Sequence, residues 1–151
     1  NRGLGKMAKV SSSLVINRSV EEVYNKAKEV EKLATFLPSI KEVKVLSQEG
    51  SVVDSFWKGE FQGREIKWKE RDFWDEEKKE CRFSLIEGDF KQYEGVWRFK
   101  EEGENKTRVE LEIEYDLGIP LVGALISKFL KKVMEENAQA MLKALQEVVE
   151  G

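Results

Sequence analysis

The chain has 151 residues, of which 40% are hydrophobic and 36% charged, with 26 Lys and Arg against 29 Asp and Glu. This length and apolar content suit one domain with a single hydrophobic core. The net charge of −3 is spread along the whole chain. A broad basic surface is therefore excluded, and direct nucleic-acid binding is not expected.

The chain contains no histidine and one cysteine, Cys81. Ser-His and Cys-His nucleophiles, His-ligated zinc and the usual general base of neutral pH are therefore excluded. A lone cysteine makes no internal disulfide or thiolate cluster, which fits a reducing compartment. We expect an inert buried thiol at Cys81 and neither metal nor cofactor. Any catalysis must depend on carboxylates, Lys or Tyr.

The sequence carries no predicted membrane or export signal. No apolar run approaches the roughly 20 residues that a membrane span needs, and the N-terminus lacks the layout of a signal peptide. We expect a soluble cytoplasmic protein. Residues 1–6 show no periodicity and are interpreted as a tag remnant or a disordered tail, so a single domain is expected over residues 8–151.

The first predicted elements are one strand and two short helices. Apolar and polar residues alternate from Ala8 to Ile16, which is the period of a strand with one buried face. Residues 19–22 form a capping box, and apolar residues follow at helical spacing up to Val30. A second short helix is predicted at about residues 32–36, ending before Pro38.

The middle of the chain, residues 40–116, is interpreted as a meander of six strands. Turn-like stretches at 48–50, 75–77, 87–89 and 101–105 interrupt an otherwise alternating pattern. Together with the first strand, this segment predicts a sheet of seven antiparallel strands.

The chain ends in a predicted long helix with a broad apolar stripe. It starts at Gly118, uses Pro120 in its first turn and runs to about Val149. At about 1.5 Å per residue the helix would be roughly 45 Å long. The order of elements predicts an α+β fold in one domain.

One helix cannot cover such a sheet. Seven strands at about 4.8 Å spacing span some 30 Å, whereas one helix covers about 10–12 Å. The sheet must curl around the helix, and large side chains, the short helices or a ligand must fill the remaining space. The abundance of aromatic residues on the strands suits either outcome, and we expect a cavity rather than a solid core.

The candidate ligand-binding residues are inward-facing aromatic side chains of the strands and one face of the long helix. Each alone is explained as well by core packing, but as a set they favour a nonpolar pocket, since Trp and Tyr are seldom buried without a polar partner. Methionines add adaptable surface. The amide of Asn137, within the apolar stripe of the long helix, can bind a polar head group of a ligand or find its hydrogen-bond partners within the core. The set is Trp57, Trp68, Phe83, Tyr93, Trp97, Tyr115, Phe129, Met134, Asn137 and Met141.

Two carboxylates conflict with this pattern. Glu70 and Asp72 share strand parity with Trp68 and Trp74, so an unbroken strand would place both on the apolar face. We expect a β-bulge or a strand end to return them to water, or pairing with Lys and Arg. If they point inward, burial raises their pKa values and makes them proton donors to a ligand carbonyl or hydroxyl, with Tyr115 as a further weak candidate for acid-base catalysis.

Three stretches resemble a known family. They are residues 23–46, which include VEKLATFLPSIKEVKVL, residues 85–99 (LIEGDFKQYEGVWRF), and a set comprising 107–109, Tyr115 and 120–125. These resemble the polyketide cyclase/dehydrase-like family of the START and birch-pollen-allergen superfamily, nearest to the branch of coenzyme-Q-binding proteins and the ribosome-association toxin. Asp89 stands where the family pattern often has proline, so we expect a less rigid turn there.

The resemblance implies the helix-grip fold, in which a curved seven-stranded antiparallel sheet wraps around a long C-terminal helix and a hydrophobic tunnel. Two short helices follow the first strand. Proteins of this superfamily carry lipids, bind quinones or hormones, cyclise polyketides or bind proteins. Fold alone therefore does not settle function.

The expected function is binding or transport of a hydrophobic small molecule, such as an isoprenoid quinone, a lipid or a polyketide-like aromatic. One alternative is a polyketide cyclase or dehydratase, which a carboxylate inside the cavity would favour. The other is a protein-interaction module of the ribosome-association type with a packed interior. A ribosomal or respiratory protein is thus a further candidate partner.

The charged residues also carry information on stability. Lys and Glu dominate them while Asn and Gln are scarce, a bias typical of heat-adapted proteins. We expect a thermophilic source and an unfolding temperature above the mesophile range of about 45–65 °C. Thermal unfolding followed by circular dichroism tests this, and a midpoint inside that range would contradict it.

Overall fold

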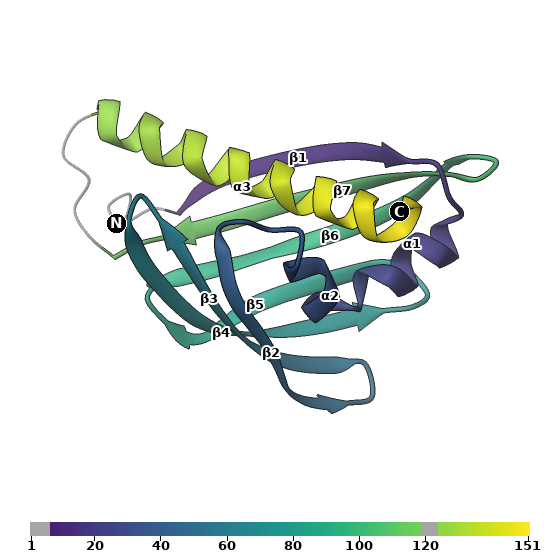
Figure 1. Cartoon of the computed structure of the whole chain (residues 1–151), viewed down its shortest axis with the longest axis horizontal. Coiled ribbons are helices and arrows are strands. Elements are labelled where there is room, and N and C mark those ends of the chain that lie inside the picture. The colour runs from purple at the N-terminus through teal and green to yellow at the C-terminus, as the bar shows by residue number, and fades with distance from the viewer. Residues whose placement is uncertain (1–6, 119–123) are drawn as a thin grey trace.

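A computed structural model of the chain describes residues 7–118 and 124–151. The expected tail at 1–6 and the helix start at Pro120 lie outside these residues. Within them the predicted order of elements is confirmed (Figure 1). The elements are β1 (Ala8–Ile16), α1 (Val20–Ala27), α2 (Val30–Ala34), β2 (Ile40–Glu49), β3 (Val52–Phe61), β4 (Arg64–Asp75), β5 (Glu80–Gly88), β6 (Gln92–Gly103), β7 (Lys106–Asp116) and α3 (Ala124–Glu150).

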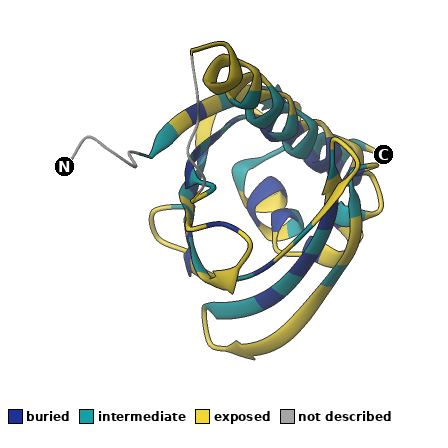
Figure 2. Ribbon diagram, turned by 90° about the vertical axis from the view of Figure 1, so that its left-hand side faces the viewer, coloured by how far each residue is buried: buried dark blue, intermediate teal, exposed yellow. Residues whose placement is uncertain are grey.

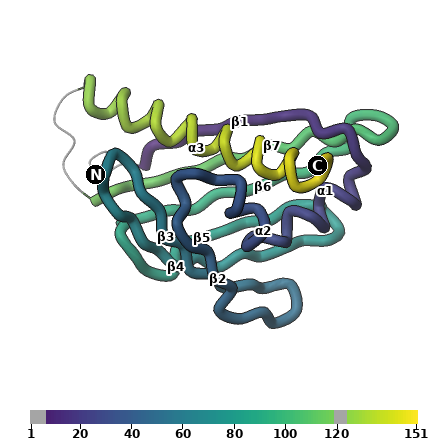
Figure 3. The backbone as a smooth tube through the Cα atoms, in the orientation of Figure 1, coloured from purple at the N-terminus to yellow at the C-terminus, as the bar shows by residue number. Residues whose placement is uncertain are grey.

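The seven strands form one antiparallel sheet in the order β1-β7-β6-β5-β4-β3-β2. Strands β2 to β7 are the predicted meander, and β1 pairs with β7 at its far edge. The sheet curls beneath α3 (Figure 2). The helices α1 and α2 lie beside the C-terminal half of α3, on the concave side of the sheet (Figure 3). This is the helix-grip fold.

The short helices begin and end for local reasons. Ser19 caps α1 as predicted, because its Oγ accepts a hydrogen bond from the Glu22 backbone N–H at 3.2 Å. Helix α2 begins at Val30, two residues earlier than predicted, and ends at Ala34. Proline follows soon after it, in the position that disfavours helix continuation.

One turn was absent from the prediction, the connection between β3 and β4. Gln62 and Gly63 both have positive φ, 52° and 77°, and Phe61 pairs with Arg64 across them. This is a two-residue hairpin turn with left-handed residues, which Asn-Gly or Asp-Gly most often forms. Glutamine is a weak signal at its first position, so the alternation alone did not reveal where β3 ends.

The core lies between the sheet and the C-terminal half of α3. Leu142 and Leu145 are fully buried. The first turns of α3 differ, since Leu125 and Phe129 are 83% and 51% exposed. The expectation that Phe129 lines the cavity was therefore wrong. Helical periodicity defines a face of the helix, but the sheet does not cover that face along the whole helix.

In the described ranges, no helix combines the length and the apolarity that crossing a membrane requires.

Two leucines of α3 allow a matched test of this core. Leu142→Ala should lower the free energy of unfolding by about 2–5 kcal/mol, because it removes a side chain from a fully buried site. Leu125→Ala removes the same atoms from an exposed site of the same helix and should stay within about 0.5 kcal/mol of wild type. Urea denaturation measures both. Equal losses would contradict the burial described above.

Candidate functional site

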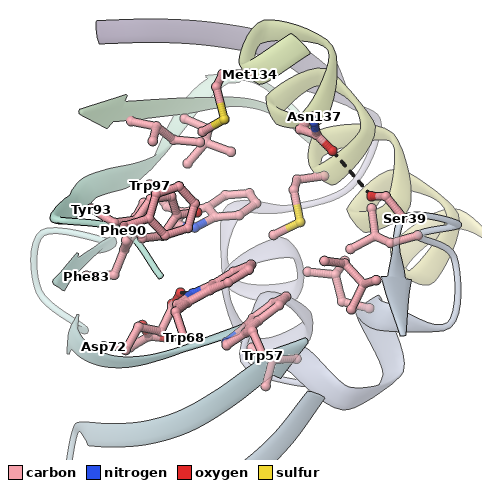
Figure 4. Close-up of a pocket in the computed structure, with 18 of the residues that line it drawn as sticks. Ser39, Trp57, Trp68, Asp72, Phe83, Phe90, Tyr93, Trp97, Met134 and Asn137 are labelled. Atoms are coloured by element: carbon pink, nitrogen blue, oxygen red, sulfur yellow. Dashed lines mark hydrogen bonds between the residues drawn. The ribbon is translucent and has the colours of Figure 1, made fainter. Parts of the chain in front are cut away.

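An internal cavity lies under α3, enclosed by the concave face of the sheet and the short helices (Figure 4). The space open to the centres of water-sized molecules is about 70 Å³. That is room for a few waters before any side chain moves. Its wall is mainly apolar, and all 4 tryptophans of the chain contribute to it. The sheet's width therefore leads to a cavity, as expected.

The structure brings eight of the predicted residues to this cavity. Trp57, Trp68, Phe83, Tyr93 and Trp97 reach it from the strands, and Met134, Asn137 and Met141 reach it from α3. Figure 4 shows the labelled rings of the strands on one side of the cavity and Met134 and Asn137 of α3 on the other.

Tyr115 was expected in the lining but does not belong to it. It is buried near the end of β7 and pairs with Ala8 of β1. Burial raises the pKa of its hydroxyl, and the charge of Glu135 on α3 adds to this effect. Tyr115 is therefore outside the cavity lining, although its cross-strand partner Tyr93 belongs to it. The suggestion that it moves protons there has no geometric basis.

Several lining residues were missed. Trp74 has the same strand parity as Trp68, so the alternation of β4 was sufficient to find it. Phe61 ends β3 at the unpredicted turn, and Phe90 follows the turn after β5, where no strand period applies. Helices α1 and α2 also contribute apolar side chains, among them Val30. Their place in the cavity depends on tertiary packing and leaves no local signal.

Asp89 fixes its turn instead of loosening it. Its Oδ2 accepts a hydrogen bond from the Lys67 backbone N–H, and its own backbone N–H donates to the Lys67 carbonyl, both at 2.8 Å. Phe90 then stacks on Tyr93, with 4.6 Å between the ring centroids. The expectation of a less rigid turn was wrong, because hydrogen bonds to β4 replace the constraint of proline.

The floor of the cavity contains a pair of parallel indoles. Trp57 and Trp68 face each other across β3 and β4, with ring centroids 5.7 Å apart and planes 8° apart. Trp57 Nε1 donates to Ser55 Oγ, and Trp68 Nε1 donates to Glu70 Oε1, both at 2.9 Å. The indole N–H groups are therefore satisfied inside the protein, and flat apolar surface forms much of the wall.

A glycine makes the neighbouring wall equally flat. Gly95 of β6 pairs with Phe83 of β5, and a Cβ at Gly95 would come within 2.5 Å of Phe83 Cζ. Because this position has no side chain, the Phe83 ring lies across β6. Tyr93 packs beside the ring, at 5.4 Å between centroids.

Glu70 and Asp72 point into the cavity, contrary to expectation. They are only 6% and 5% exposed and belong to its lining. A β-bulge does occur beside Glu70. The β4–β5 pairing shifts between Lys69 and Glu70, and Ile86 of β5 has no partner on β4. The extra residue belongs to β5, so β4 keeps its alternation and both carboxyl groups stay on the inner face.

Burial is the main cause of the raised pKa values of both carboxyl groups. They lie two residues apart on the same face of β4, and the negative charge of Glu70 raises the pKa of Asp72 further, which favours one proton shared by the pair. The described lining residues include neither Lys nor Arg. Within the described chain, Asp72 Oδ1 is buried without a hydrogen-bond partner. The pair is therefore the polar centre of an apolar chamber.

Asn137 is satisfied within the protein. Its Oδ1 accepts a hydrogen bond from Ser39 Oγ at 3.3 Å, the dashed line of Figure 4, and its Nδ2 donates to the Val133 carbonyl at 2.8 Å. Its position at the cavity wall thus links α3 to the connection between α2 and β2.

Cys81 is 1% exposed, and burial raises the pKa of its thiol above the usual value. The side chain therefore stays an uncharged thiol at neutral pH.

The raised pKa of Asp72 predicts a pH dependence of stability. Above about pH 4 the unfolded chain releases this proton while the folded protein retains it, so the free energy of unfolding falls as the pH rises. Asp72→Asn removes that contribution and should flatten the decline between about pH 5 and 8. Urea denaturation at several pH values measures the slopes. Glu65→Gln, on the exposed face of the same strand, is the control and should keep the wild-type slope.

Comparison with known proteins places the chain in a family. Residues 16–142 match the family described as polyketide cyclase / dehydrase and lipid transport. No curated protein matches the chain. Among solved structures, the protein TTHA0849 of Thermus thermophilus is 39% identical and superposes with a TM-score of 0.89, over 94% of this chain and 97% of that one.

Two more distant structures share the fold. The Zhui aromatase/cyclase of Streptomyces sp. R1128 is 17% identical, with a TM-score of 0.86 over 95% of this chain and 94% of that one. A START superfamily protein of Mycobacterium smegmatis is 20% identical, with a TM-score of 0.79 over 94% and 97%. The sequence match covers most of the chain, and the chain therefore belongs to the polyketide cyclase/dehydrase and lipid transport family, with the START-like helix-grip fold.

Proposed function

We propose that this protein binds a hydrophobic small molecule with at least one polar oxygen in the cavity under α3. The observation that carries the proposal is an apolar, largely aromatic chamber with one unpartnered buried oxygen, Asp72 Oδ1. Burial of the ligand's apolar surface supplies about 25 cal/mol per Å² before the costs of ordering. The polar group of the ligand gains a hydrogen-bond partner, which fixes its orientation.

The shape of the wall favours a planar ring system as ligand. Trp57 and Trp68 lie parallel, and Phe90 stacks on Tyr93. Flat aromatic faces gain most from flat aromatic partners. Support for a polyketide-like aromatic or a quinone head group is therefore better than support for an unbranched lipid chain. The structural neighbour that is an aromatase/cyclase agrees with this preference.

A cyclase or dehydratase is the second candidate function. The observation that favours it is the placement of Glu70 and Asp72 inside the cavity, since a simple carrier needs only an apolar lining. Binding of the hydrophobic substrate is the first step in either case. The protein-interaction alternative supposed a packed interior, and the cavity gives it no support.

Native mass spectrometry of the purified protein, followed by organic extraction, tests the proposal. A hydrophobic compound at one copy per chain would support it. Binding of 1-tetralone, a bicyclic aromatic ketone, provides a second readout by tryptophan fluorescence. Trp97→Ala should weaken that binding by about tenfold or more, because it removes an aromatic side chain from the cavity wall.

Phe129→Ala is the matched control for Trp97→Ala. It also removes an aromatic ring, but from an exposed position outside the lining, and should leave binding unchanged. Equal effects of the two substitutions would contradict the proposed site. So would an empty protein that binds neither 1-tetralone nor any member of a quinone and lipid panel.

A further inference from the structure

The carboxyl pair of β4 is more polar than a binding cavity requires. Glu70 and Asp72 are both more than nine-tenths buried, and both line the chamber. Glu70 Oε1 accepts a hydrogen bond from the indole N–H of Trp68, and Asp72 lies two residues farther along the same face of β4. Asp72 Oδ1, buried and unpartnered among the described residues, belongs to the same wall. This geometry is that of two groups positioned to share a proton beside an open space.

The surroundings contain further groups that titrate or carry charge. Burial is the main cause of the raised pKa values of Asp72, of Cys81 on β5 and of Tyr93 on β6. The charge of Asp54 on β3 adds to the effect at Asp72, and the two carboxyl groups add to it at Cys81 and Tyr93. The charge of Lys28, which follows α1, lowers the pKa of Cys81 and is directed at the ring of Tyr24.

The remaining walls contribute no charge to the cavity. The described lining residues from α1, α2, β2 and α3 are uncharged. A single proton held between the two carboxyl groups is therefore the main means by which the chamber limits its negative charge.

We propose that Asp72 and Glu70 act together on a carbonyl compound, binding its oxygen and converting it to the enol. This inference rests on the proposed function, since the ketone must first occupy the cavity. It goes further by naming the ligand chemistry, an enolisable aromatic ketone, and the residues that act on it.

The step needs no external reagent. Asp72 donates its proton to the carbonyl oxygen, while Glu70 takes a proton from the carbon next to the carbonyl. The electron pair of the broken C–H bond becomes the new C=C bond, and the carbonyl π electrons form the new O–H bond. The pair holds one proton before and after the step, and the reverse reaction restores the ketone. Keto-enol exchange of this kind precedes ring closure and loss of water in oxygenated carbon chains.

A carbonyl suits this pair better than a ligand cation does. The buried carboxyl groups already hold a proton between them, and Trp68 Nε1 stabilises Glu70 at 2.9 Å. The pair thus limits its own charge and needs no ammonium group for that purpose. An amine ligand makes the opposite prediction, because its ammonium group would pair with the negative charge that the two carboxyl groups retain.

Three molecules of one ring skeleton separate these chemistries by binding. They are 1-tetralone, its hydrocarbon counterpart tetralin, and the amine 1-aminotetralin. The wild-type protein should bind 1-tetralone about tenfold more tightly than tetralin, since one buried hydrogen bond is worth about that factor. Asp72→Leu should bring the two affinities together, because it removes the hydrogen-bonding group from position 72, whereas asparagine would keep an N–H donor there. Equal wild-type affinities for the ketone and the hydrocarbon, or tightest binding of the amine, would overturn the inference.

Hydrogen exchange of 1-tetralone in D₂O measures the proposed reaction directly. Proton NMR should show that wild-type protein accelerates loss of the hydrogens next to the carbonyl by about 100-fold or more. Asp72→Asn and Glu70→Gln should each reduce this rate close to background. Glu65→Gln, an exposed carboxyl on the outer face of β4, should retain it. Thermal unfolding of each variant checks its fold.

The pH profile tests the pair without any substitution. Exchange needs one proton on the pair, so its rate should be bell-shaped, falling when both groups are protonated and again when both are ionised. Binding of the ketone without accelerated exchange would overturn the inference and leave the proposed function standing. Failure of all three ring compounds to bind would overturn both.

Discussion

The width of the sheet relative to the helix it holds determines the rest of this structure. Seven strands need far more apolar cover than one helix provides, so the sheet curls and still leaves space on its concave side. The short helices and the aromatic side chains reduce that space without filling it. Large rings suit this role because they cover wide areas of wall from few positions. The cavity is therefore a product of the architecture, and its chemistry depends on the few polar groups in its wall.

The carboxyl pair shows how a polar group survives in such a wall. An isolated buried carboxylate is costly, whereas Glu70 has the Trp68 N–H and Asp72 as partners. Asp72 Oδ1 has no hydrogen-bond partner among the described residues. Natural cores tolerate few such atoms, and those that persist often have a role in binding or chemistry. The buried oxygen that lacks a hydrogen-bond partner therefore belongs to a residue at the centre of the proposed binding site.

Periodicity predicted the fold well because most of the strands and the C-terminal half of the long helix have one buried face. It failed where contacts with another strand, helix or turn determine whether a side chain faces the cavity. The alternation of β4 placed Glu70 and Asp72 inside, but only the pairing with β5 shows that the bulge lies at Ile86. The stripe of α3 includes Phe129, yet how far the sheet extends beneath it is a tertiary property. Phe90 depends on a turn held by Asp89, which no local period indicates.

The two edges of α3 differ in their hydrogen bonds to the rest of the protein, and the bond between Ser39 and Asn137 belongs to the weaker edge. Along β1 the helix is fastened through Ser12 to Gln139 and through Asn17 to Glu150. Along the α2–β2 connection, the described side chains offer one neutral hydrogen bond of 3.3 Å, a contact worth about 1 kcal/mol. Separation of that edge leaves every strand pairing intact. Among the described side chains, the edge of α3 beside α2 is therefore the less strongly hydrogen-bonded of the two, and its separation does not require the sheet to open.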